Sequence, residues 1–152
     1  MKEPLVSRAL RYALYAVFAL GAACTATLPF MLDTYARVLR DGYFSAPGYR
    51  LYILIFLMAV GVLCLWIVFE MILMLRSIPK GPFVTRNVRA LNRIGVVFLV
   101  LAAAFLCKCL AYITFLTLLC GVFFIGCGLF AFTLAALIRQ AVAFREENDL
   151  TI

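Results

Sequence analysis

Two ionisable side chains lie within otherwise apolar stretches of this chain. Glu70 is the only charged residue from Leu51 to Leu75, and Lys108 is the only one from Ile94 to Ile138. Because a charge inside a membrane is costly, each is a candidate functional residue. Their predicted depths differ by roughly 13 Å at the rise of a helix, so we do not expect them to pair. We expect Lys108 to extend to the outer headgroups and Glu70 to reach loop arginines, with Arg76 the nearest.

Proton-coupled transport is the alternative role for Glu70. Small multidrug exporters are also four-helix proteins with one buried carboxylate, and Trp66, one turn before Glu70, is placed to stack on a cation. Those exporters carry their carboxylate in the first helix, nearer the middle of the membrane. The position of Glu70 therefore disfavours a transporter.

All six cysteines fall in apolar stretches, and the chain has no histidine. A C-x-C spacing without histidine is not a zinc pattern, so we predict no metal site. Four-helix membrane thiol oxidases place reactive cysteines at the outer face, but they use C-x-x-C and a second pair that this chain lacks. We favour a packing role and keep thiol redox chemistry as an alternative. The cysteines that this alternative would use are Cys107, Cys109 and Cys120.

The elements that position these residues are membrane-spanning helices. With 67% hydrophobic and 14% charged residues, the composition excludes a water-soluble core. The run 94–138 is about twice the ~20 residues that one crossing needs, so it must fold back as two helices. We predict an all-α, integral membrane four-helix bundle with up-down topology, forming one domain over 1–152. The predicted spans are 12–31, 51–75, 94–113 and 116–138, followed by a tail at 139–152.

Lysine and arginine gather at one predicted end of the bundle. Of 14 such residues, three lie in 1–11, five in 76–93 and two in 139–152, whereas the loop 33–50 has three, offset by Asp33 and Asp41. The positive-inside rule therefore places both termini in the cytoplasm. The net charge of +7 then faces the anionic lipids of the inner leaflet and does not require nucleic acid as a direct partner.

The segment from Pro79 to Arg93 is the most organised polar part of the sequence. Pro79 and the following Gly-Pro pair end the second helix, and a new helix is predicted from about Thr85. Val88 and Leu91 share one face of this amphipathic, interfacial segment, which leads into the third span, and its arginines share the other face. Either the arginines anchor the segment on lipid phosphates, or they form a basic docking surface for an acidic cytosolic partner.

Two predicted helices carry stripes of small residues, which allow helix backbones to approach closely. The stripe of the first helix consists of Ala9, Ala13, Ala16, Ala23 and Thr27. The stripe of the fourth helix consists of Thr117, Gly121, Gly128 and Ala135. For the first stripe we predict close helix packing. For the second we favour packing within the bundle over a homodimer interface, although the sequence does not decide between them.

Three stretches resemble a family of bacterial membrane proteins, domain-of-unknown-function family 2975. They are Gly-Pro-Phe at 81–83, Asn-Val-Arg-Ala-Leu-Asn-Arg-Ile-Gly at 87–95 and Phe-Arg-Glu-Glu-Asn-Asp-Leu-Thr-Ile at 144–152. The four-crossing layout fits the family over the whole chain. The chain departs from the family at Thr85 and Arg86, where members often carry acidic residues.

The resemblance implies a function without catalysis, because the family has no established activity and its members are similar to partners of small helix-turn-helix regulators encoded beside them. By analogy, this is a modulator or tether of such a regulator at the bacterial cytoplasmic membrane. Without a phosphate-binding glycine loop, a paired carboxylate or a histidine, the sequence predicts no enzyme and no cofactor. A second interpretation of the tail is that its acids pair with the loop arginines. The expected contact residues are Arg86, Arg89, Arg93, Glu146, Glu147 and Asp149.

Overall fold

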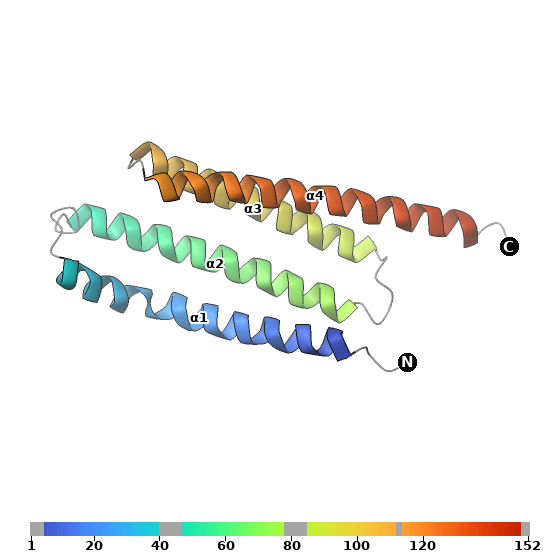
Figure 1. Cartoon of the computed structure of the whole chain (residues 1–152), viewed down its shortest axis with the longest axis horizontal. Helices are drawn as coiled ribbons and strands as arrows, with labels where there is room; N and C mark the ends of the chain where they lie inside the picture. Colours follow the sequence, from blue (N-terminus) through green and yellow to red (C-terminus); the bar gives the residue numbers. More distant parts are fainter. Residues whose placement is uncertain (1–4, 40–46, 78–84, 112–113, 150–152) are drawn as a thin grey trace.

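The structure is a computed structural model that describes residues 5–39, 47–77, 85–111 and 114–149. Within these ranges the chain forms four α-helices and no strand. Each helix is long and apolar enough to cross a membrane, and successive helices run in opposite directions (Figure 1). The all-α, up-down four-helix prediction is therefore confirmed. The helices are α1 (Leu5–Leu39), α2 (Pro47–Ser77), α3 (Thr85–Ala111) and α4 (Phe115–Asp149).

Both terminal helices extend beyond their predicted spans. Helices α1 and α4 each contain 35 residues. A predicted span ends at the first charged residue, whereas the hydrogen bonding of the helix continues past it. Helix α2 begins at Pro47, where the missing N–H of proline costs nothing. At the other end of the chain, residues 139–149 of the predicted tail continue α4 without a break.

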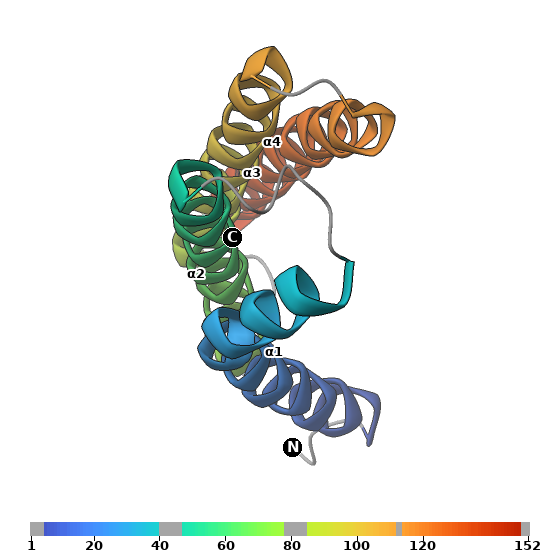
Figure 2. The same ribbon diagram turned by 90° about the vertical axis from the view of Figure 1, so that its left-hand side faces the viewer.

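The helices pack in the order in which they occur in the chain. Among the described residues, close backbone contacts join α1 to α2, α2 to α3 and α3 to α4, and no others. Seen end-on in Figure 2, the four helices follow one another along a curve, with α1 and α4 at its two ends. The bundle is therefore open, and α2 and α3 form its centre.

The main core lies where α2, α3 and α4 meet. Leu101 of α3 is fully buried there, beside Ile67 of α2 and Ala131 of α4. Phenylalanine rings extend this core, with centroids 5.2 Å apart for Phe56 and Phe105. A third ring, Phe124, lies 5.4 Å from Phe105. Such aromatic contacts add to the apolar burial and link α2 to the α3–α4 hairpin.

Helices α3 and α4 approach each other closely at glycines. A Cβ atom at Gly128 would lie 3.1 Å from Leu99 Cδ2 and 3.2 Å from the backbone oxygen of Gly95, and one at Gly121 would lie 3.1 Å from Leu106 Cδ2. The stripe of α4 is buried along its length. Its predicted role in packing within the bundle is confirmed.

The stripe of α1 behaves differently, and the prediction that it packs closely is wrong. All five of its residues are exposed in the structure. Helix α1 packs on α2 with its opposite face, where Gly21 meets Leu65 and Thr25 meets Gly61. A Cβ atom at Gly61 would lie 2.7 Å from Thr25 Oγ1. The tighter of the two glycine contacts in this helix pair is therefore at Gly61 of α2.

The predicted helix start at Thr85 is confirmed by α3, whereas Pro79 and the Gly-Pro pair lie outside the described residues. Val88 and Leu91 of the amphipathic segment are buried with Ala135 of α4, and Met74 of α2 packs against them. The apolar face of this segment thus packs on the protein itself. Its arginines remain on the outer side of the first turns of α3.

Candidate functional site

The candidate site is the end of the bundle at which α1 and α3 begin and α2 and α4 end (Figure 1). We call it the basic end, because the described arginines at these helix termini are Arg8, Arg11, Arg76, Arg86, Arg89, Arg93 and Arg139. Up-down topology places them together although they are far apart in the sequence. The two chain termini therefore lie at one end, as predicted.

An ion pair between Glu70 and Arg93 joins α2 to α3 at this end. Arg93 Nη2 donates a hydrogen bond to Glu70 Oε2 at 3.1 Å, and Arg93 Nε lies 3.0 Å from Oε1 as an ion-pair contact. A hydrogen bond between ionised partners is shorter and stronger than one between neutral groups. Glu70 is 3% exposed, whereas the Arg93 side chain is 57% exposed. The carboxylate is therefore held inside the bundle by a cation at its surface.

The expectation that Arg76 is the nearest partner of Glu70 is wrong. Arg76 instead donates to the hydroxyl oxygen of Tyr15 on α1, with Nη2 2.6 Å and Nε 3.0 Å away. Arg76 follows Glu70 by six positions, so the two side chains point about 120° apart around α2. Glu70 faces α3 and Arg76 faces α1. Two arginine contacts thus connect α2 to both of its neighbours.

The predicted contact arginines separate into two groups. Arg93 is engaged by Glu70, whereas Arg86 and Arg89 are exposed on the first turn of α3. Arg89 also lines a hollow of about 250 Å³ between the start of α3 and the end of α4. A second polar hollow, of about 410 Å³, is lined on α1 by Arg8, Arg11, Tyr12 and Tyr15.

The acidic tail is helical as far as Asp149, and α4 projects past the other helices at the basic end (Figure 1). Glu147 is exposed. The side chains of Glu146 and Asp149 lie outside the described residues, as do residues 150–152. The pairing of tail acids with loop arginines therefore stays a prediction, but Arg93 already has Glu70 as its partner.

Lys108, the second charge within a span, contacts α2. Its Nζ atom lies 5.1 Å from the centroid of the Phe56 ring, a cation–π geometry. Glu70 and Lys108 are not paired with each other, as their depths predicted. The aromatic ring is a partner that sequence analysis did not identify.

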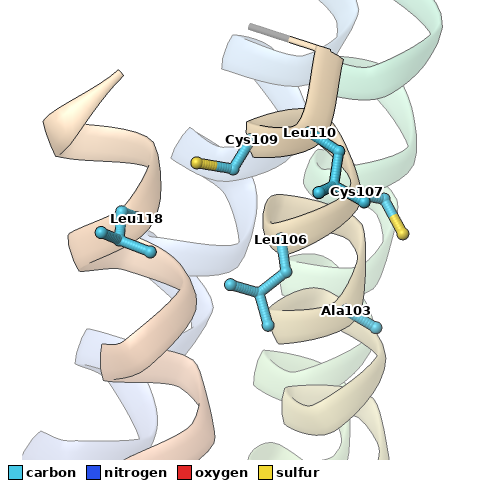
Figure 3. Close-up of a pocket in the computed structure, with 6 residues that line it drawn as sticks. All are labelled: Ala103, Leu106, Cys107, Cys109, Leu110 and Leu118. Carbon is cyan, nitrogen blue, oxygen red and sulfur yellow. The ribbon is translucent and has the colours of Figure 1, made fainter. Parts of the chain in front are cut away.

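All six cysteines are free thiols. Cys107 and Cys109 line an apolar hollow of about 640 Å³ with Leu106, Leu110 and Leu118. Figure 3 shows the two sulfur atoms on different sides of α3, with Cys109 on the side of α4 and Cys107 pointing away from it. This arrangement does not bring the C-x-C pair together. Within the described ranges, no group of three metal-ligating side chains is found either.

These observations define a multi-pass membrane protein built from four apolar helices, with clustered arginines at one end. Its family follows from comparison with known proteins. The model of the family described as "Protein of unknown function (DUF2975)" matches residues 7–152, and the chain belongs to this family. No curated protein and no solved structure matches the chain.

Sequence analysis missed the aromatic partners of the basic end and of the spans. Tyr15 and Arg76 lie at similar predicted depths in the first and second helices, and this similarity is the sequence feature from which their contact could have been predicted. Asn87, 3% exposed, is a buried polar residue at the start of α3 that the amphipathic pattern also missed. In each case the residue type alone is common at a membrane interface, so only the packing reveals the contact.

Proposed function

We propose that this is a non-enzymatic protein of the bacterial cytoplasmic membrane that modulates or tethers a small cytosolic helix-turn-helix regulator at its basic end. The basic end would face the cytoplasm, as the distribution of lysine and arginine indicates. The expected kind of partner comes from the family. Its members are similar to partners of small helix-turn-helix regulators, and this chain belongs to the family.

The observation that carries the proposal is the projecting end of α4. The helix continues 11 residues from Arg139 to Asp149, about 16 Å at the rise of a helix. This segment combines two arginines with Glu146, Glu147 and Asp149. Arg139 and Val142 still lie beside the start of α3, and the end of α4 that follows them projects past the other helices. A charged helix of this kind is a recognition element that a cytosolic protein can reach.

The first turn of α3 supplies the second part of the proposed contact surface. Arg86 and Arg89 are exposed, and they complement an acidic partner surface. Arg93 is paired with Glu70 and would position the start of α3, which carries this surface. The ion pair also disfavours the transporter alternative, because the carboxylate is already bound by a cation. The divergent sulfur atoms of Cys107 and Cys109 disfavour a disulfide between these two cysteines, whereas pairing of Cys109 with Cys120 of α4 stays a prediction.

Affinity purification after mild crosslinking in the native cells tests the proposal. The full chain is compared with a variant lacking residues 145–152 and with the double variant Arg86→Gln/Arg89→Gln. We expect a small DNA-binding protein with the full chain and its loss from the truncated variant. Capture that is unchanged by the truncation would place the contact elsewhere. An eluate without a cytosolic partner would contradict the tether.

A further inference from the structure

The hollow between the start of α3 and the end of α4 brings two arginines from different helices to one cavity. It has a volume of about 250 Å³ and is lined by Val88, Arg89, Asn92, Arg139 and Val142. We propose that this hollow binds the phosphate of an anionic phospholipid headgroup. Arg89 belongs both to this hollow and to the proposed contact surface, but the lipid site is tested on the purified protein without a cytosolic partner, so the two proposals can fail separately.

The positive charges of the two arginines at the hollow favour an anion as its ligand. Within the described parts of the chain, neither Arg89 nor Arg139 has a hydrogen bond or an ion pair. Both side chains line the same hollow of about 250 Å³, and like charges that share a small cavity repel each other. The phosphodiester of an anionic lipid, placed between them, supplies one negative charge that reduces this repulsion, and its oxygens can accept hydrogen bonds from both guanidinium groups. The side-chain amide of Asn92 is a further donor.

The composition and depth of the hollow favour a lipid over a soluble anion. Val88 and Val142 form apolar walls beside the arginines, which suits the glycerol and acyl region of a phospholipid. The candidate membrane spans of α3 and α4 are Arg86–Leu110 and Phe115–Phe144. Arg89 and Arg139 therefore lie just inside the ends of these spans, at headgroup level.

The other arginines of the basic end show why this pair stands out. Arg93 is neutralised by Glu70, and Arg76 donates to Tyr15. Arg86 is exposed near Arg89 in sequence but does not line the hollow. Arg86 is therefore a control for Arg89, because it has the same charge and lies at the same end of α3 but is outside the hollow.

Native mass spectrometry of the detergent-solubilised full chain tests the site. Phosphatidylglycerol is titrated beside phosphatidylcholine with the same acyl chains, and inorganic phosphate is added as a competitor. We expect Arg89→Gln/Arg139→Gln to weaken phosphatidylglycerol binding by at least about tenfold, because charge-assisted hydrogen bonds are lost. We expect Arg86→Gln to change it less than about twofold and Arg139→Lys to fall between these two variants.

Three results would overturn the proposal. An equal loss in Arg86→Gln would mean diffuse attraction to the basic end. Equal binding of the two lipids, which share the phosphodiester, would mean that the hollow does not select an anionic headgroup. Inorganic phosphate that displaces the lipid at equal concentration would assign the hollow to a soluble anion. Helix content measured by circular dichroism controls for folding, and the single variant Arg139→Gln replaces the double variant if the latter does not fold.

Discussion

Helices α1 and α4 carry the same kind of small-residue stripe and use it in opposite ways. In α4 the stripe is buried against α3, with Gly128 in contact distance of the Gly95 backbone. In α1 the stripe is exposed, and the opposite face of the helix packs on α2. A small-residue pattern therefore permits close packing but does not select a partner.

The difference follows from what each helix meets across the interface. Leucines of α3, such as Leu99 and Leu106, fill the space beside the glycines of α4, so that large residues pack against small ones. On α1, the close approach is made by Thr25 against a glycine of α2. In a membrane, an exposed alanine face costs little, because lipid is as apolar as another helix. The face of α1 opposite α2 is then free of packing constraints within one chain.

The largest effect is expected from enlarging the buried stripe. Gly128→Leu would place side-chain atoms on Leu99 and on the Gly95 backbone, and we expect a loss of about 3 kcal/mol in the free energy of unfolding. Unfolding in mixed detergent micelles measures it. Gly126→Leu, on the same helix, is the control, because a Cβ atom there has no neighbour within 4 Å. Equal losses in the two variants would contradict the packing described for α4.

A smaller effect is expected at the ion pair that joins the two helical hairpins. Arg93→Gln leaves the Glu70 carboxylate buried without its cation, and we expect a loss of about 2 kcal/mol, below the range for a fully buried pair because Arg93 is partly exposed. Glu70→Gln removes the buried charge itself and should cost about half as much. A double-mutant cycle in the same unfolding assay measures the coupling. Additive losses would show that the pair does not join the hairpins.

The smallest effect is expected at the exposed stripe. Ala16→Leu should change the free energy of unfolding by less than about 0.5 kcal/mol, because the side chain would meet no other helix of the chain. The same assay checks it, with Gly128→Leu as the sensitive counterpart. A loss comparable to that of Gly128→Leu would mean that this face of α1 is covered, and the contrast between the two stripes would no longer hold.

Only part of the basic end could be predicted from the sequence. The clustering of arginines follows from the spans and their order, and the exposed positions of Arg86 and Arg89 follow from the helical repeat. The partner of Glu70 does not. Arg76 is nearer in the chain, but its direction around α2 points it at Tyr15, whereas antiparallel packing of α3 brings Arg93 to the carboxylate. Residue spacing describes one helix and not the helix beside it.

The sequence by itself determined the four apolar helices, their alternating directions, the start of α3 at Thr85 and the family, because hydropathy, helix caps and motifs are local properties. The tertiary structure decided which face of α1 packs, which cation holds Glu70, and which arginines share a hollow with Val142. The physical reason is that hydrophobicity does not distinguish a helix face covered by lipid from one covered by protein. Shape and charge at each contact make that choice.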